Sequence, residues 1–404
     1  MSSHSHSWAK TFGPRHLAQT ALLIAIGWLI GHARPIEHAS RVLWDATELA
    51  FGRELEGKDH VSLVTISAKE YAEMFDASSP LDPDRLAALI AKTLGAEPKR
   101  LYVDIDTSAA RFRDLDIRIA YYLACNSSKG CPAGKFSTFA EDRCRPAAKP
   151  SGPMVLADLL REQIETVNKV VRWARAVELN EDGQYVGPAL VLGGADVAER
   201  AGLVAVRPST DGRVRDFPIL PLPALWQLAA RDLAELEPRL AEKMSNVKLT
   251  ERPVFLAAFR DPRFTETSAS NLMTGETAKL KGKVVFLGGR YDRADAFYLG
   301  DGQPHPGVTL LAAASLAHAN AEFVREGPVF ELMAKIALGL MILIVNQKVE
   351  RPLVRLVLVL GGLAFLCIGI VYFAFLRFST ILSLAPLLLS ILLEQSVEGT
   401  LSKA

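Results

Sequence analysis

The sequence lacks an excess of charge of either sign. Its 46 lysine and arginine residues are matched by 45 aspartate and glutamate residues, which leaves a formal net charge of +1. A chain with so little net charge has no global field that would attract nucleic acid. We therefore exclude a nucleic-acid-binding role and expect no nucleic acid among the partners.

The common signatures of enzymes are missing as well. Residues 35–328 contain no Gly-X-Ser-X-Gly motif, no His-Glu-X-X-His motif and no histidine cluster. The run KVVFLGGRYD resembles the strand and turn of a phosphate-binding loop. A dinucleotide fingerprint needs a third glycine at a fixed spacing, and none follows Gly288 and Gly289. We expect neither catalysis nor a cofactor, and interpret the glycine pair as a strand end that turns closely beneath a surface loop.

Cysteine is scarce, with four residues in the chain. Cys125, Cys131 and Cys144 share a stretch rich in glycine, serine, proline and lysine, which predicts a loop over about residues 122–152. In an oxidising compartment two of the three could form a disulfide, and the sequence does not say which two. A zinc site is the competing hypothesis, but no histidine lies nearby and the spacing matches no zinc finger. We expect no metal.

Apolar residues, in contrast, are abundant at 50% of the chain, and they gather in clusters. The clusters cover residues 17–31, 329–345, 353–376 and 378–393. A helix needs roughly 20 apolar residues to cross a bilayer, so the clusters predict one N-terminal and three C-terminal transmembrane helices. For the first cluster a cleaved signal peptide is the alternative, but no clear small-residue cleavage pattern follows it.

Basic residues flank these clusters asymmetrically. They are Lys10, Arg15, Lys348, Arg351, Arg355 and Lys403, with Arg377 the exception to the pattern. If four helices cross in turn, these flanks lie on one side, which the positive-inside rule makes cytoplasmic. We expect a multi-pass protein of a bacterial inner membrane with both termini in the cytoplasm. Residues 1–34 would hold the N-terminus and first helix, 35–328 a large periplasmic domain, 329–394 three helices and 395–404 a short tail.

Strand and helix patterns alternate within residues 35–328. Strands are expected in HVSLVTIS, LYVDID, PVFLAAF and KVVFLGG, and two more, joined by a turn at Asp211 and Gly212, in LVAVRPSTDGRVRDFPI. Helices are expected in DPDRLAALIAKTL, with Asp82 as N-cap and Pro83 in the first turn, in LPALWQLAARDLAEL and in HPGVTLLAAASLAHA. This order predicts an α/β domain with a mixed sheet and flanking helices.

The motifs resemble, in their order, the second class of CHASE domain, the cyclase- and histidine-kinase-associated sensory extracellular module. The pieces are DPDRLAALIAKTL, YVDIDTS, RDLDIRIAYYLA, STDGRVRDFPI, LKGKVVFLGG and HPGVTLLAAASL, between the first and the later hydrophobic clusters. The resemblance implies an external sensory domain followed by a cytoplasmic effector. In relatives the first strand commonly ends in an acidic residue, whereas here it ends at Thr65, Ile66 and Ser67. Only QSVEGTLSKA follows Glu394, so we expect a separate effector protein.

Several charged residues are candidates for a ligand site. Asp104 and Asp106 alternate along LYVDIDTS, so we expect their side chains to point the same way from a strand end. Together with Asp292 or Asp295 they could bind a cation or the amine of a ligand. The competing interpretation is that they cap the next helix or solvate the strand end. Arg215 could bind an anionic ligand or a partner's acidic face, or carry solvated charge on an exposed hairpin.

Two hypotheses on function follow, and neither is enzymatic. In the first, an inner-membrane sensor binds an external ligand or partner and relays the change through its transmembrane bundle to a separate effector protein. In the second, the domain is a non-sensing structural scaffold in an envelope or membrane complex. We expect a homo-oligomer, because signalling through helices usually needs relative motion between subunits.

Overall fold

The protein is described here by a computed structural model, in which the chain forms two compact units. One comprises Gly52–Phe323 and the other Met1–Phe51 with Val324–Ala404. The structure describes residues 55–127, 153–179, 185–188, 190–194, 198–204, 214, 216–217, 223–245, 254–255, 264–291, 296–298, 303–320, 325–326 and 380–381.

In the second unit the described residues form one parallel strand pair, β12 (Arg325–Glu326) with β13 (Thr380–Ile381). The expected fourth transmembrane helix included Thr380 and Ile381, and for these two residues the helix prediction is wrong. Both side chains are β-branched, which favours an extended backbone. The rest of the four predicted spans lies outside the described residues. Within the ranges that the structure describes, no helix combines the length and the apolar character needed to cross a membrane.

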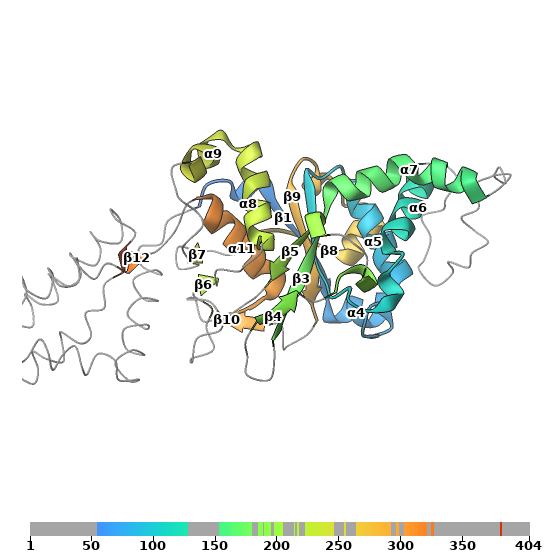
Figure 1. Cartoon of the computed structure of the whole chain (residues 1–404), viewed down its shortest axis with the longest axis horizontal. Coiled ribbons are helices and arrows are strands. Elements are labelled where there is room, and N and C mark those ends of the chain that lie inside the picture. Colours follow the sequence, from blue (N-terminus) through green and yellow to red (C-terminus); the bar gives the residue numbers. More distant parts are fainter. Residues whose placement is uncertain are drawn as a thin grey trace, which may run out of the picture. The chain divides into compact units, whose positions relative to one another are not determined.

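A seven-stranded mixed sheet forms the centre of the Gly52–Phe323 unit (Figure 1). The strand order is β4–β3–β2–β9–β1–β8, and β5 also pairs with β3. The strands are β1 (Val61–Ser67), β2 (Arg100–Asp104), β3 (Val171–Leu179), β4 (Tyr185–Pro188), β5 (Ala201–Val204), β8 (Thr265–Ser268) and β9 (Val284–Arg290). All pairs are parallel except β3 with β4. The predicted α/β domain with a mixed sheet is confirmed.

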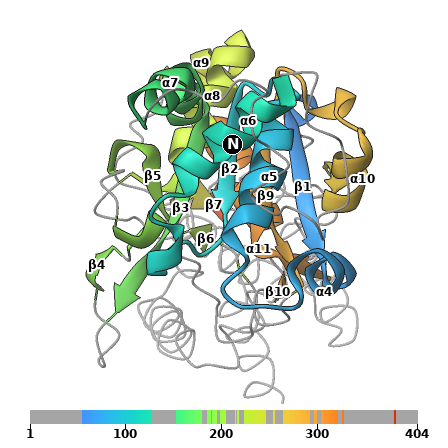
Figure 2. The same ribbon diagram turned by 90° about the vertical axis from the view of Figure 1, so that its right-hand side faces the viewer.

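Helices cover both faces of this sheet (Figures 1 and 2). On one face lie α4 (Ala68–Phe75), α5 (Pro83–Leu94), α6 (Leu115–Ser127), α7 (Pro153–Val170) and α10 (Ala269–Thr274). On the other lie α8 (Leu225–Leu236), α9 (Pro238–Ser245) and α11 (Gly307–Ala319). Because side chains alternate along a strand, each central strand contributes to the hydrophobic cores on both faces of the sheet. In β9, Val285 and Leu287 face the α5 side, whereas Val284 and Phe286 face the α11 side.

Two helices begin where the sequence predicts. Asp82 caps α5, because its Oδ1 accepts hydrogen bonds from the backbone N–H of Asp84 at 3.0 Å and of Arg85 at 2.9 Å. Pro83 occupies the first turn, where its missing N–H costs nothing. Helix α11 begins directly after Pro306, and all of its residues are buried. It is therefore a core helix with no polar face.

The predicted hairpin around Asp211 and Gly212 is wrong in its pairing. Strand β5 pairs in parallel with β3, whereas β6 (Asp216–Phe217) pairs antiparallel with β7 (Val254–Phe255) in a separate sheet. The middle of β5 is buried, which suits a strand inside a parallel sheet. The turn itself lies outside the described residues. A turn signal predicts a change of direction, but burial decides which strands pair.

Candidate functional site

The carboxyl ends of the parallel strands meet at one edge of the sheet, which we call the carboxyl edge. Asp104, Gly288, Thr65 and Ser268 lie side by side there, across β2, β9, β1 and β8. Open α/β sheets bind ligands at this edge, where neighbouring strands continue toward opposite faces. Strand β2 continues to α6 on one face and β9 to α11 on the other. Strand β1 likewise continues to α4 on the face of α6, so the chain changes face on both sides of β9. Of these two boundaries, the one between β2 and β9 holds a predicted carboxylate.

Asp104 lies at this boundary. It is the last residue of β2 and is half-buried. Because side chains alternate along a strand, it shares the α11 side of the sheet with Tyr102. A Cβ atom on the neighbouring Gly288 would lie only 2.7 Å from Val308 Cβ and 3.4 Å from Asp104 Cβ. Glycine thus lets the first turn of α11 pack against the strand ends beside the carboxyl group.

The second glycine of the pair has a different close contact. A Cβ atom on Gly289 would lie 2.6 Å from Tyr291 Cε1, and the Tyr291 ring stacks on Tyr71 with centroids 4.2 Å apart. Both glycines therefore permit close packing of side chains at the end of β9. The described neighbours of the pair are a helix and an aromatic ring, where the sequence predicted a surface loop.

Of the other predicted acidic residues, the structure describes Asp106. Strand β2 ends at Asp104, but Ile105 packs in the same core as Leu101 and Val103, so the alternation continues past the strand end. That Asp104 and Asp106 point the same way stays a prediction. Asp106 is exposed, and its Oδ1 accepts a hydrogen bond from the Ser108 N–H at 2.8 Å, which fixes the turn after the strand. Asp292, Asp295 and Arg215 lie outside the described residues, so their part in a site stays a prediction.

A buried carboxylate at the same edge joins two helices. Glu70 Oε2 accepts from the Ser67 N–H at 2.7 Å, and its Oε1 accepts from the Ser270 N–H at 2.7 Å and Oγ at 2.6 Å. Burial alone would raise the pKa of Glu70, but the hydrogen bonds from Ser270 and Ser67 outweigh it and lower the pKa. Glu70 thereby holds the N-termini of α4 and α10 together, which is a stabilising role.

A second carboxylate reaches the end of β1 from its neighbour. Thr65 Oγ1 donates to Glu266 Oε1 at 2.6 Å, and Arg290 approaches the same oxygen at 3.4 Å. Both Glu266 and Arg290 are exposed. The sequence reasoning missed this contact because it did not predict β8. The run TETSAS does carry a signal, since Ser268 caps α10 as Ser67 caps α4.

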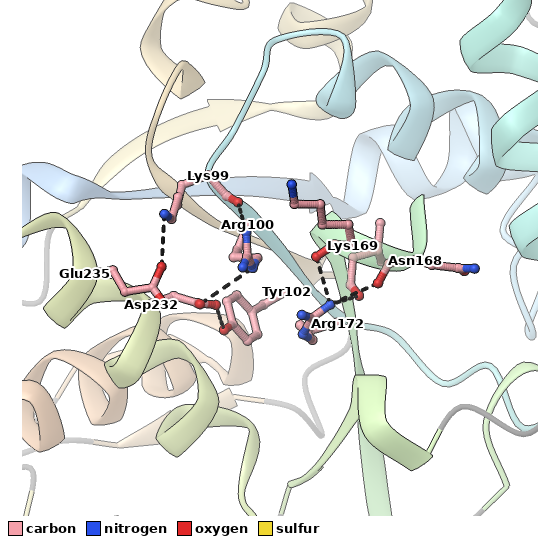
Figure 3. Close-up of polar contacts among 9 residues, drawn as sticks. Lys99, Arg100, Tyr102, Asn168, Lys169, Arg172, Asp232 and Glu235 are labelled. Atoms are coloured by element: carbon pink, nitrogen blue, oxygen red, sulfur yellow. Dashed lines mark hydrogen bonds and ion pairs between the residues drawn. The ribbon is translucent and has the colours of Figure 1, made fainter. Parts of the chain in front are cut away.

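The opposite edge of the sheet carries a buried polar network (Figure 3). Asp232 of α8 accepts a hydrogen bond from the Tyr102 hydroxyl, and its Oδ1 lies 3.5 Å from Arg100 Nε. The Lys99 ammonium pairs with Glu235 at 2.9 Å. Burial, together with the Asp232 charge, raises the pKa of Tyr102 well above its usual value, and burial also raises the pKa of Asp232.

The same close-up shows how Arg172 closes a helix (Figure 3). Its guanidinium donates to the carbonyl oxygens of Asn168 at 3.2 Å, Lys169 at 3.1 Å and Val171 at 2.9 Å. Burial lowers the pKa of Arg172. Perturbed pKa values mark functional sites and structural ion networks alike. Arg172 binds the end of α7, and Asp232 of α8 binds Tyr102 and Arg100, so we assign these groups the role of fixing α7 and α8.

Comparison with known families identifies the chain. A family model described as the CHASE2 domain matches residues 20–346, which is most of the sequence. The chain belongs to the CHASE2 family. CHASE2 domains are extracellular sensory domains, so this protein carries a sensory domain. The resemblance predicted from the order of motifs is confirmed. No curated protein and no solved structure matches the chain.

The remaining candidates of this CHASE2 protein are only partly described. Cys125 lies buried near the end of α6, while Cys131 and Cys144 lie outside the described residues, so a disulfide stays a prediction. Within the described ranges no group of three acidic, histidine or cysteine side chains is placed to hold a metal ion. Of the predicted site residues that the structure describes, Asp104 lies at the carboxyl edge beside β9 and Asp106 lies just beyond it.

Proposed function

We propose that this CHASE2 protein is a sensor of the bacterial inner membrane. Its α/β domain lies in the periplasm, binds a ligand or partner at the carboxyl edge, and relays the change through membrane helices to an effector protein. The observation that carries the proposal is the extent of the family match. It begins inside the first hydrophobic cluster, at residue 20, and ends at residue 346, at the close of the second cluster.

The chemistry at the carboxyl edge supports a cationic ligand. Asp104 offers a half-buried carboxylate beside Gly288, and Asp106 places an exposed carboxylate two residues further along the chain. A carboxylate at the margin of a packed domain pairs well with an amine or a hydrated divalent cation. We therefore propose a small amine or cation as the ligand class.

A thermal-shift screen of the full chain in detergent micelles tests this proposal. The probes are amino acids with free amines, polyamines, and calcium and magnesium ions. A true ligand should raise the unfolding midpoint of the wild type. It should raise that of the control variant Asp59→Asn equally, because Asp59 is exposed at the amino end of β1, away from the carboxyl edge. The same probe should leave Asp104→Asn unshifted. An equal shift in Asp104→Asn would place the ligand elsewhere.

One observation favours the scaffold as a second candidate function. At the ends of β1 and β8 the described polar groups already bind one another, as Thr65 does with Glu266 and Glu70 with Ser270. Purification with co-eluting proteins, followed by mass measurement of the assembly, separates the candidates. A homo-oligomer whose partners change when a ligand is added supports the sensor. An assembly of fixed composition that ignores every probe supports the scaffold.

A further inference from the structure

One amide side chain joins the points where the chain enters and leaves the α/β unit. That unit begins at Gly52 and ends at Phe323. Asn320 Oδ1 accepts a hydrogen bond from the Glu56 N–H at 3.2 Å, and Asn320 Nδ2 donates to the Glu56 carbonyl at 2.9 Å. The same nitrogen donates to the Leu316 carbonyl at 2.9 Å. Asn320, which is 6% exposed, therefore binds both backbone groups of Glu56.

Helix α9 supports this junction from a third direction. Lys243 Nζ donates to Asn320 Oδ1 at 3.0 Å and lies 3.4 Å from Glu56 Oε2. Gly57 has a φ of +83°, and a Cβ atom there would lie 2.7 Å from Leu240 Cδ1. The entry segment thus passes close against α9 in a backbone conformation that favours glycine. We call Glu56, Gly57, Lys243 and Asn320 the Asn320 clamp.

The geometry of the clamp resists sliding. A side-chain amide that binds the N–H and the C=O of one residue imitates a pair of bonds in an antiparallel ladder. A shift of the entry segment by one residue would remove both Glu56 backbone groups from Asn320 and break both bonds. It would also leave the buried amide without its Glu56 partners, although the bond to the Leu316 carbonyl would remain, and the lost bonds are unfavourable. Tilting both segments together breaks neither bond.

We propose that the Asn320 clamp makes the entry and exit segments one mechanical body. A conformational change of the domain would then be transmitted out of the domain as a joint movement of both segments. One segment would not slide against the other. The clamp itself depends only on the described contacts, whereas its part in signalling rests on the proposed sensor function.

Hydrogen exchange followed by mass spectrometry on the full chain in micelles tests the clamp without any ligand. In Asn320→Ala the Glu56 amide should exchange about ten-fold faster, because it loses its acceptor. Amides in the last turn of α11 should accelerate with it, while those of α5 and β9 keep their wild-type rates. The matched control is Asn168→Ala, which removes an exposed amide at the end of α7 and should change nothing at Glu56.

Asn320→Asp covers the case in which Asn320→Ala loosens the whole domain. Aspartate keeps the oxygen that accepts from Glu56 and Lys243 but loses the Nδ2 donor, so exchange should rise by about three-fold and only around residues 55–60 and 316–320. A Glu56 amide that exchanges in the wild type as fast as an unprotected amide would overturn the proposal. So would an unchanged rate in both variants. Neither result depends on whether the protein is a sensor.

Discussion

The two edges of one sheet bury their charged residues to different extents. At the amino edge, Asp232 and Tyr102 are buried and Arg100 is half-buried, while Asn320 is the buried member of its clamp. At the carboxyl edge, Glu70 is buried, whereas Asp104 is half-buried and Glu266 and Arg290 are exposed. The amino edge is also where the chain enters before β1 and leaves after α11. The comparison favours an anchoring role for the amino edge, and the proposed recognition at the carboxyl edge would use its more exposed charges.

The largest expected effect comes from breaking the amino-edge network. Asp232→Ala leaves the buried Tyr102 hydroxyl and the Arg100 guanidinium without their carboxylate, and we expect a loss of about 3–5 kcal/mol of unfolding free energy. Glu235→Ala is the control, because its pair with Lys99 is largely exposed, at 55% for the glutamate side chain. It should cost less than about 1 kcal/mol. Chemical unfolding of the full chain in micelles measures both, and equal losses would contradict the assignment.

Overpacking the carboxyl edge should have a smaller effect. In Gly288→Ala the new Cβ meets Val308 Cβ at 2.7 Å, so strand or helix must shift. We expect a loss of up to about 3 kcal/mol in the same unfolding assay. Gly95→Ala is the matched control, since its Cβ would find its nearest neighbour at 3.4 Å and its φ is −61°. If both variants unfold like the wild type, α11 does not pack on β9 as described.

The pH dependence of the unfolding free energy tests how strongly the amino edge buries a titratable group. His318, near the end of α11, is buried, and burial together with the Arg231 charge lowers its pKa from 6.5 to about 4. The unfolded chain therefore binds a proton before the folded chain does as the pH falls through 6.5, and stability is lost. Between pH 7 and pH 5 this loss should be about 2 kcal/mol.

His318→Gln provides the comparison for that titration. Glutamine cannot titrate in this range, so the difference in unfolding free energy between wild type and variant should shrink as the pH falls from 7 to 5. A difference that stays constant over the interval would show that His318 is not held neutral by its surroundings.

Local signals in the sequence predicted individual elements well. The Asp82 and Pro83 pair located the start of α5, and the apolar run before Gly288 located β9. Charged residues concealed β3, because Arg172 separates Val171 and Trp173, which become buried only beside β2 and β5, and Arg175 then breaks the apolar pattern. The hairpin prediction failed for a related reason, since the partner of β5 is set by the assembled sheet.

The candidate site was predicted only in part. The apolar run LYV predicts a strand that ends near Asp104, so the sequence alone located this residue at the carboxyl edge. The contact between Glu70 and Ser270 joins residues 200 positions apart, and the clamp joins residues 264 positions apart. Hydrophobic periodicity along the sequence cannot predict such distant pairs, because they depend on how the strands are ordered in the sheet.

The account depends most on the compartment of the α/β unit, and cysteine labelling in intact cells tests it directly. Asp59→Cys and Lys403→Cys would be introduced separately into a chain whose own four cysteines are replaced by serine. A maleimide that cannot cross the inner membrane should label the exposed position 59 in intact cells and position 403 only after lysis. Labelling of 403 alone in intact cells, with 59 protected until lysis, would contradict a periplasmic sensory domain.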